Sequence, residues 1–358
     1  MCGFVGFVGK QSKEEKRKII KDMANMIIHR GPDSDGYYID DNVALGFRRL
    51  SIIDLDNGSQ PIYNEDKSML IVFNGEIYNY KELKEELINK GHKFKTNTDT
   101  EVILHGYEEY KEELFNKLRG MFSFVIYDIK NNTLLGVRDP FGIKPFYYYK
   151  NDKEFMFASE IKGMLVNPNF KKEINDKSLK MYLIFQYSVF EETFFKNVYK
   201  LKPGHYFIYK NNNLEVKEYF DIIYQKEDKP YEEYQKEITK VLEDSIKYHK
   251  VTSDVEVGSY LSGGVDSSYV VAKAKPNKTF SVGFEENGFD ETKLAHDFSD
   301  IMHVKNSSRY ISKEDFFSSL PKVQYYTDEP HANLSTVPLL FLSELAAKDV
   351  KVVLSGEG

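Results

Sequence analysis

The feature that most constrains the fold of this chain is a change in the order of its expected elements near residue 225. Before that point, strand-like runs such as 43–53, 69–73 and 121–128 follow one another with two or three helices between them. This pattern is typical of an α+β layered domain. Beyond residue 233, apolar strands alternate with helices and run into glycine-rich turns, which predicts a doubly wound parallel sheet.

The segment between the two patterns predicts a domain boundary. YQKEDKPYEE, at 224–233, is charged and contains Pro230, as linkers often do. We therefore expect an N-terminal domain at 1–222, a linker at 223–232 and a second domain at 233–358. In a chain of 358 residues, each domain is long enough to bury its own core.

Charge and cysteine content exclude several classes of protein. The net charge is −7 with acidic and basic residues interleaved, so no nucleic-acid or membrane partner is expected. No apolar run is long enough to span a membrane, and the N-terminus lacks the apolar core of a signal peptide. The single cysteine allows neither a disulfide nor a cysteine-rich zinc site, and no HExxH motif is present. We expect a cytoplasmic protein.

Cys2 is the first candidate for chemistry because of its position. Most lone cysteines are small buried hydrophobic residues. Removal of Met1, which a small second side chain favours, would give Cys2 a free α-amino group with a pKa of about 7.7–8.0. That amine can accept the thiol proton and later donate it to a leaving group. The sequence therefore predicts an N-terminal nucleophile that attacks a carboxamide.

Residues 1–150 resemble the class II glutamine amidotransferases, whose fold is the αββα sandwich of the N-terminal nucleophile enzymes. After the opening MCGFVGF, five blocks occur in the order and spacing of that family: HRGPD at 29–33, RLSIIDL at 49–55, FNGEIYNY at 73–80, TDTEVILHGY at 98–107 and RDPFGIKPFYY at 138–148. The resemblance implies that Cys2 hydrolyses glutamine to glutamate and ammonia.

The same resemblance assigns roles to four residues. Asn74 and Gly75 would form the oxyanion hole through the side-chain amide and the backbone N–H. Arg49 would bind the glutamine α-carboxylate and Asp99 its α-ammonium. Each has a simpler alternative: a hairpin turn for Asn74 and Gly75, a surface ion pair for Arg49, and a helix N-cap for Asp99.

Three neighbouring residues are expected to take no part in the chemistry. Arg48 is expected to be the solvated neighbour of Arg49. His29 and Arg30 are expected to support the loop that contains them. In the family, RDPFGIKP is structural and close to the domain interface, and we expect the same here.

LSGGVDSS, at 261–268, follows an apolar strand and precedes a helix. A bare Ser-Gly-Gly is more often a flexible turn, but in this setting backbone N–H groups can close around a phosphate. The full SGGxDS resembles the pyrophosphate loop of the N-type ATP pyrophosphatases. The resemblance implies an ATP site formed by Leu261, Ser262, Gly263, Gly264, Asp266, Ser267 and Ser268. Asp266 would also bind Mg²⁺.

Two further segments would complete the nucleotide site. FSVGF, at 280–284, resembles the adenine-side strand of the family, with backbone contacts from Val282. LSGEG, at 354–358, would place Ser355 and Gly356 against the nucleotide. Glu357 would act as a catalytic residue that assists formation or breakdown of an aspartyl-adenylate. The alternative for Glu357 is a solvated loop acid.

The combined order of these segments resembles the glutamine-hydrolysing asparagine synthetases over essentially the whole chain. The resemblance implies that ATP adenylates aspartate and that ammonia from glutamine converts the adenylate to asparagine; it also suggests a homodimer. Val265 departs mildly from the family, which more often has Leu there. The family continues well beyond SGEG, so we expect a truncated chain with an incomplete second domain.

Other functions stay open at this stage. One is another amidotransferase-coupled adenylating ligase, such as a β-lactam synthetase-like or peptide-modifying relative, although such relatives can lose the nucleophile that Cys2 supplies here. Others are a truncated form that retains only glutaminase activity and a non-enzymatic fragment with a binding role. A sugar-phosphate amidotransferase is disfavoured by SGGVDSS, because sugar isomerisation needs no ATP.

Overall fold

The computed structural model describes residues 2–251, 253–286, 290–330 and 332–357. The chain divides into two compact units, Met1–Ile223 and Tyr224–Gly358. The division falls at the start of the charged segment 224–233. Among the described residues, no helix is both long and apolar enough to cross a membrane.

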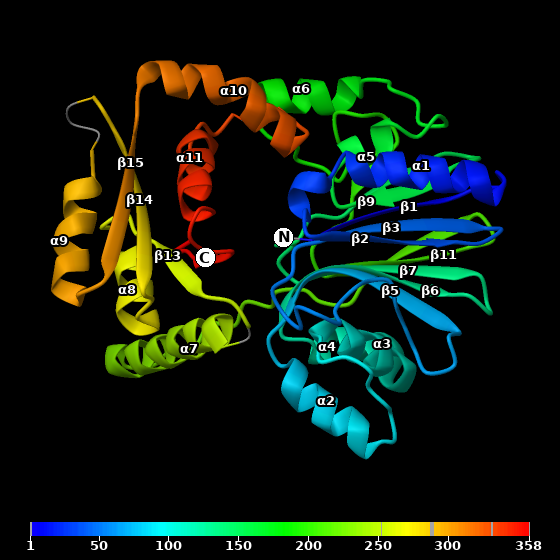
Figure 1. Ribbon diagram of the computed structural model, residues 1–358, viewed down its shortest axis with the longest axis horizontal. Coiled ribbons are helices and arrows are strands. Elements are labelled where there is room, and N and C mark those ends of the chain that lie inside the picture. The colour runs from blue at the N-terminus through cyan, green and yellow to red at the C-terminus, as the bar shows by residue number, and fades with distance from the viewer. Residues whose placement is uncertain (1, 252, 287–289, 331, 358) are drawn as a thin grey trace. The chain divides into compact units, whose positions relative to one another are not determined.

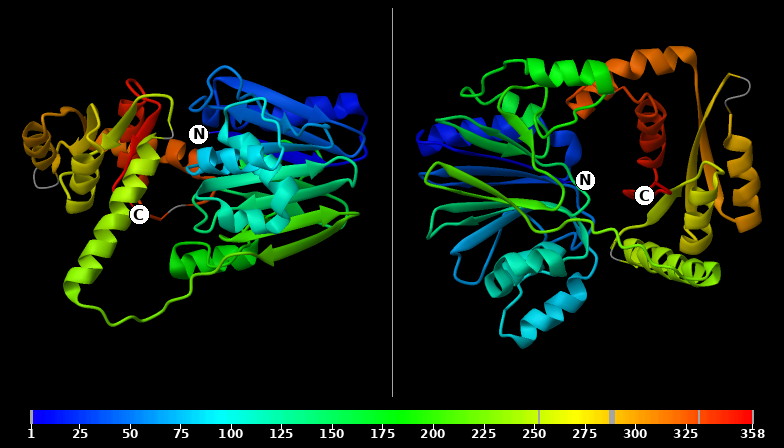
Figure 2. Two further views of the ribbon diagram at one scale, coloured as in Figure 1. Left: turned by 90° about the horizontal axis from the view of Figure 1, so that it is seen from below. Right: turned by 180° about the vertical axis from the view of Figure 1, so that it is seen from behind.

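The first unit contains two stacked antiparallel sheets (Figures 1 and 2). The first has the order β10-β8-β9-β1-β3-β2, with the bounds β1 (Gly3–Val8), β2 (Ser34–Ile39), β3 (Val43–Arg49), β8 (Tyr147–Lys150), β9 (Phe155–Ala158) and β10 (Val198–Lys200). The second has the order β12-β11-β7-β6-β5-β4, with the bounds β4 (Ile62–Tyr63), β5 (Met69–Ile77), β6 (Gly120–Asp128), β7 (Thr133–Arg138), β11 (His205–Lys210) and β12 (Asn213–Glu218).

Helices cover the outer faces of this pair of sheets (Figure 1). Those near the first sheet are α1 (Lys13–Asn25) and α5 (Lys162–Leu165), with the short 3-10 helix η1 (Ile28–Arg30) after α1. Those near the second sheet are α2 (Tyr80–Asn89), α3 (Asp99–Tyr110), η2 (Lys111–Glu113) and α4 (Leu114–Lys117), while α6 (Asp176–Phe185) follows later in the chain. Three apolar cores separate the four layers. The expected αββα sandwich is therefore confirmed.

The sequence explains where several of these elements begin and end. Ser12 and Glu15 form a capping box, which starts α1. Asn79 holds the N-cap position of α2, but its side chain does not cap the helix: it accepts from the N–H of Arg119 and donates to the carbonyl of Lys117. The strand expected at 43–53 ends at Arg49, because the chain then turns back over the Arg49 guanidinium.

The second unit contains a parallel sheet with the order β15-β14-β13-β16. Its strands are β13 (Val257–Tyr260), β14 (Lys278–Phe284), β15 (Lys305–Ile311) and β16 (Val352–Leu354). Its helices are α7 (Tyr231–Val251), α8 (Val265–Ala274), α9 (Thr292–Met302), α10 (Lys313–Thr327) and α11 (Thr336–Ala346). The α10 helix ends before Asp328, whose φ is +64°, and α11 begins at Thr336.

Helices of the second unit cover both faces of its sheet (Figure 1). Leu261, Val271 and Ala295 pack α8 and α9 against one face. Ile311 and Val337 belong to the core that packs α10 and α11 against the other face. A parallel sheet with a helical layer on each side is the expected doubly wound arrangement.

Candidate active site

A pocket in the first unit brings together the residues that the amidotransferase motifs singled out. It lies where the start of β1, the end of β3, the middle of β5 and the start of α3 meet. The residues that line it are Cys2, Arg49, Leu50, Ile52, Ile53, Gly58, Gln60, Phe73, Asn74, Gly75, Glu76, Thr98, Asp99, Thr100 and Lys144.

Cys2 places its sulfur against the backbone of Leu50. The Sγ atom lies 3.4 Å from the Leu50 nitrogen, which donates to it, and 3.5 Å from the Leu50 oxygen. Burial raises the pKa of the Cys2 thiol, and the Leu50 hydrogen bond opposes this effect only in part. The thiol is therefore protonated at neutral pH, so a base must generate the reactive thiolate.

Arg49 is buried at the end of β3. Its guanidinium donates to the carbonyls of Ile53, Asp54 and Leu55 at 3.2, 2.6 and 3.1 Å. The alternative of a surface ion pair is therefore wrong. Since these bonds use Nη2 and one N–H of Nη1, the N–H groups of Nε and Nη1 can still bind a carboxylate.

The edge of β5 explains why Gly75 can act as a donor. The Phe73 N–H and carbonyl face Gln60, whose side chain bonds both, and the Ile77 N–H donates to Asp99 at 2.9 Å. Because alternate residues of a strand direct their peptide groups to the same side, the Gly75 N–H points between these two contacts. A Cβ on Gly75 would lie 2.2 Å from the Met121 carbonyl oxygen. Only glycine fits here.

Asn74 lies beside the nucleophile and is fully buried. Its amide nitrogen donates to the Cys2 carbonyl at 2.8 Å, and its amide oxygen accepts from Arg30 Nη2 at 3.3 Å, in the orientation that satisfies both partners. The amide nitrogen carries a second N–H. Asn74 and Gly75 lie inside β5, paired with Ser123 and Phe122, so the alternative of a hairpin turn is wrong.

Asp99 is a buried carboxylate at the far side of the pocket. Burial, together with the negative charge of Glu76, raises its pKa to about 7, although the hydrogen bond from the Ile77 N–H acts in the opposite direction. Thr98 holds the N-cap position of α3 and Asp99 is the first helical residue. The N-cap alternative for Asp99 is therefore wrong, and its carboxylate is directed to Ile77 and the pocket.

Glu76 and Lys144 also line the pocket, although neither was singled out from the sequence. Burial raises the pKa of Glu76, and Lys144 opposes this effect. Burial lowers the pKa of Lys144 to about 8, against the charge of Glu76. Both residues stand inside quoted motifs, FNGEIYNY and RDPFGIKP. Their position in these motifs was the sequence evidence that could have identified them as pocket residues.

The expectations for the arginines near the site need one correction. Arg48 is not solvated: its guanidinium is buried and donates to Ala24 O at 3.2 Å and to the Asn25 side chain. Neighbouring residues of a strand point to opposite faces, so Arg48 faces α1 while Arg49 faces the pocket.

Arg30 does more than support its loop, because its Nε donates to the Cys2 carbonyl at 2.9 Å. His29 contacts Glu160.

In the second unit, the SGGVDSS segment forms a tight strand–loop–helix turn. Gly263 has a φ of +79°, and a Cβ there would lie 2.5 Å from Leu294 Cβ, so glycine is required. The loop is held by Ser262 and Ser267, whose hydroxyls lie 3.0 Å apart, and by the Gly264 N–H, which donates to Ser262 Oγ. Asp266 and Ser268 follow in the first turn of α8, and Leu261 is buried beneath the loop.

Val282 lies in β14 at the level of this loop. The Phe280 carbonyl accepts from the Leu261 N–H, so the peptide groups of Phe280 face β13. Val282 is two residues further along β14, so its peptide groups face the same side as those of Phe280. At this level β13 has already ended, at Tyr260, so its backbone no longer pairs with Val282. This geometry directs the Val282 backbone to the region next to the SGGVDSS loop.

The LSGEG segment approaches the start of α8. A Cβ on Gly356 would lie 2.6 Å from the Ser267 nitrogen, so the two loops are in close contact. The Ser355 hydroxyl accepts from the Glu357 N–H at 3.1 Å. The Glu357 side chain is exposed, which is consistent with the alternative of a solvated loop acid. Its catalytic role stays a prediction.

The fold and the pocket define the class of the first unit, an amidotransferase of the N-terminal nucleophile type. A family model described as a glutamine amidotransferase domain matches residues 1–220, and a model described as asparagine synthase matches residues 237–358. The chain belongs to the family of glutamine-hydrolysing asparagine synthetases.

Two synthetases of one organism agree with this assignment. The chain is 45% identical to asparagine synthetase [glutamine-hydrolyzing] 1 of Bacillus subtilis, over 100% of this chain and 58% of that protein. It is 31% identical to asparagine synthetase 3 of the same organism, over 100% of this chain and 62% of that protein. The solved glutamine phosphoribosylpyrophosphate amidotransferase from B. subtilis is a remote likeness, with a TM-score of 0.47 and 14% identity over 86% of this chain and 65% of that one. The chain thus spans about three fifths of the length of these synthetases.

Proposed function

We propose that this chain carries out glutamine-dependent asparagine synthesis, with glutamine hydrolysis in the first unit and aspartate adenylation in the second. The observation that carries the proposal is the convergence of Cys2, Arg49, Asn74, Gly75 and Asp99 on one pocket. The two family matches support the coupling of that pocket to an ATP-dependent unit.

In the first unit, Arg49 binds the α-carboxylate of glutamine and Asp99 its α-ammonium, which places the side-chain amide at Cys2. The free α-amine of Cys2 takes the thiol proton as Sγ attacks the amide carbon. The Gly75 N–H and the second N–H of the Asn74 amide stabilise the oxyanion. The protonated amine then delivers its proton to the departing ammonia, and water hydrolyses the thioester to glutamate.

In the second unit, the N–H groups at the start of α8 and the hydroxyls of Ser262, Ser267 and Ser268 bind the phosphates of ATP. Asp266 offers an exposed carboxylate beside them, which together with phosphate oxygens is the ligand set that Mg²⁺ takes. Mg²⁺ would neutralise phosphate charge there. The aspartate β-carboxylate attacks the α-phosphorus and releases pyrophosphate. Ammonia then attacks the acyl carbon and displaces AMP, giving asparagine.

The first test measures glutamate released from glutamine by the chain and by Cys2→Ala. We expect the variant to lose at least ~10³-fold in rate, because removal of a nucleophile leaves only weak residual catalysis. Arg17→Ala, a change on the exposed face of α1, is the matched control and should hydrolyse glutamine at the wild-type rate. Undiminished glutamate release by Cys2→Ala would refute the nucleophile assignment.

The second test supplies [amide-¹⁵N]glutamine, aspartate and Mg-ATP and follows ¹⁵N-asparagine, AMP and pyrophosphate. We expect the three products in equal amounts. In a version extended to the length of the B. subtilis relative, ammonia should replace glutamine as nitrogen donor, even with Cys2→Ala. Turnover with a different acceptor in place of aspartate would move the function to another adenylating ligase, whereas glutamate release alone would leave only the glutaminase. We further propose that the protein acts in the cytoplasm as a homodimer, which light scattering can check.

A further inference from the structure

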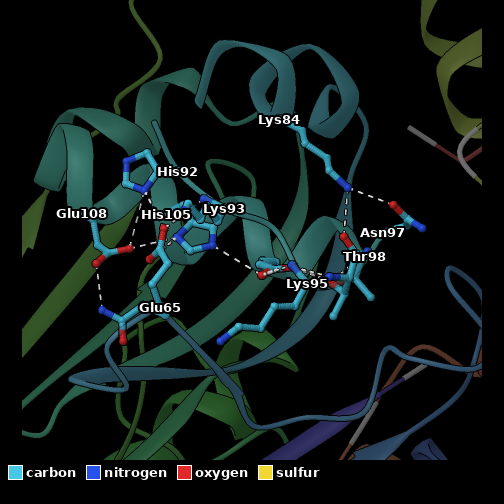
Figure 3. A network of polar contacts seen from close by, with 12 residues as sticks. Glu65, Lys84, His92, Lys93, Lys95, Asn97, Thr98, His105 and Glu108 are labelled. Atoms are coloured by element: carbon cyan, nitrogen blue, oxygen red, sulfur yellow. Dashed lines mark hydrogen bonds and ion pairs between the residues drawn. The ribbon is translucent and has the colours of Figure 1, made fainter. Parts of the chain in front are cut away.

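A cluster of two histidines and two glutamates lies on the first unit, outside the glutamine pocket (Figure 3). Its members come from three separate segments. Glu65 lies in the turn between β4 and β5, His92 in the loop after α2, and His105 and Glu108 one turn apart on α3. No step of the proposed reactions uses them.

The ligand atoms of the cluster lie close together: one atom from each of the four residues can be chosen so that all lie within 4.8 Å of one another. His105 Nδ1 is 2.9 Å from Glu108 Oε2 and 3.2 Å from Glu65 Oε2. His92 Nδ1 is 3.4 Å from Glu65 Oε1 and 4.0 Å from Glu108 Oε2. A tetrahedron with metal–ligand distances of roughly 2.0–2.2 Å has edges of about 3.3–3.6 Å. The four separations lie around these values, but they involve both oxygens of Glu65 and the ligand atoms spread over up to 4.8 Å, so the side chains must draw closer together when a metal binds.

Surrounding residues hold the ligands in this orientation. The opposite ring nitrogen of each histidine faces a further carboxylate: His105 Nε2 lies 3.4 Å from Glu101 Oε1, and His92 Nε2 lies 3.6 Å from Glu109 Oε2. A carboxylate behind the imidazole is the usual companion of a metal-binding histidine. Asn64 Nδ2 donates to the other oxygen of Glu108 at 2.8 Å.

The local charge also favours a cation. Glu65, Glu101, Glu108 and Glu109 surround the two imidazoles, and His105 and Glu101 are almost completely buried. Lys90 offsets one of these charges through Glu109 at 2.8 Å. The side chains of Glu65, Glu108 and Glu109 keep 34, 22 and 32% of their surface exposed, so a cation from solvent can reach the negative charge of the cluster.

We propose that Glu65, His92, His105 and Glu108 form a binding site for a divalent transition metal of the Zn²⁺ class. Two imidazoles and two carboxylates suit zinc better than magnesium, which prefers an all-oxygen octahedral set. With four protein ligands the site is closed, which is characteristic of a structural metal. The metal joins the β4–β5 turn, the segment before α3 and α3 itself.

This site is connected to the glutamine pocket through α3 (Figure 3). The Glu101 carboxylate, which faces His105, accepts from the Thr96 N–H and hydroxyl, both at 2.7 Å. The Thr96 hydroxyl lies 2.8 Å from that of Thr98, which lines the pocket next to Asp99. The metal therefore stiffens the segment that positions the start of α3.

The experiment measures Zn²⁺ binding to the full chain in the Cys2→Ala background, so that the thiol cannot bind the metal. After treatment with a chelator, we expect one Zn²⁺ per chain to be taken up at micromolar concentration. Co²⁺ in its place should give the intense visible absorption of a four-coordinate site. Zinc should raise the melting temperature by several degrees, because a ligand that binds only the folded state stabilises it.

Two variants and one control decide between the outcomes. His105→Gln removes a buried ligand and can disturb folding, so His92→Gln, at a more accessible position, is the main variant. It should lose zinc uptake, the cobalt spectrum and the thermal shift while remaining folded. His205→Gln removes another histidine that contacts a glutamate, Glu218, and should change none of them. No uptake by the parent chain, or equal uptake by His92→Gln, would show an ion-pair network without a metal site.

Discussion

At the residue scale, burial of Asp99 lowers the stability of the folded protein but places a carboxylate where the ammonium of glutamine would bind. A carboxylate buried next to Glu76 favours its neutral form, and its pKa rises to about 7. The unfolded chain ionises this group near its ordinary value, so folding stability falls as the pH rises from about 4 to about 7. The charge that would bind the ammonium of glutamine is therefore present only at a cost to the folded state.

We predict that Asp99→Asn stabilises the protein and impairs glutamine binding. At pH 8 the variant should gain roughly 2–4 kcal/mol in the free energy of unfolding, because the shift from 3.8 to about 7 no longer applies. Its amide oxygen can still accept from the Ile77 N–H. The KM for glutamine should rise at least about a hundredfold. Urea denaturation and steady-state glutaminase kinetics measure the two effects.

The pKa of Asp99 also predicts the direction in which the KM for glutamine changes with pH. In the wild-type protein, the KM for glutamine should rise as the pH falls below about 7, because Asp99 becomes protonated. In Asp99→Asn this part of the profile should be flat. Asp22→Asn, which changes an exposed aspartate of α1, should leave stability and KM unchanged. If Asp99→Asn is destabilising at pH 8, the burial cost has been assigned to the wrong group.

The residues of the pocket were predicted to different extents. Arg49, Asn74, Gly75 and Asp99 stand in recognisable motifs, and the structure brings all four to the Cys2 pocket. The interpretation of Arg48 failed because its neighbours in the sequence do not reveal that α1 covers that face of β3. The roles of Arg49, Asn74, Gly75 and Asp99 in catalysis stay predictions.

At the element scale, the strand–loop–helix turn before α8 depends on one glycine more than on its neighbour. Gly263 has a positive φ and no space for a side chain, whereas Gly264 has a φ of −70° and its nearest atom, Ser262 Oγ, is 3.3 Å from an added Cβ. The motif SGG therefore combines two glycines of unequal structural importance.

We predict that Gly263→Ala destabilises the second unit by about 2 kcal/mol or more, through positive φ and contact with Leu294. Gly264→Ala should cost less than ~1 kcal/mol. Calorimetric unfolding of the two variants measures the difference. Equal destabilisation would mean that the loop adopts another conformation in solution.

Elements formed by local patterns were the ones that the sequence predicted well. The strand–turn–helix at SGGVDSS, for example, depends on residues close together in the chain. The histidine–glutamate cluster was missed because Glu65, His92 and His105 come from separate segments. Only the spacing of His105 and Glu108, three residues apart on a helix, was visible in the sequence.

At the scale of the whole molecule, the glutamine pocket is built entirely from the first unit. The change of element pattern near residue 225 was enough to predict two different architectures, because an antiparallel sandwich and a parallel sheet need different connections. The sequence pattern alone did not show which strands are neighbours in each sheet.

We predict that residues 1–223, produced alone, fold and hydrolyse glutamine. Their catalytic efficiency should lie within about threefold of that of the full chain, since each pocket residue and its core belong to this unit. Circular dichroism and glutamate release measure this, with Cys2→Ala in the same fragment as the control. A fragment that is folded but inactive would show that the second unit is needed to complete the site.

The position of β1 has a consequence for when activity can arise. β1 lies inside its sheet, where it pairs with β3 and, across about 150 residues of sequence, with β9. Long-range pairings of this kind form late in folding. During synthesis, the nucleophile is the first part of the site to leave the ribosome, but β1 cannot pair with β9 until β9 has been made. A nascent chain therefore consumes no glutamine until almost the whole amidotransferase unit has been translated.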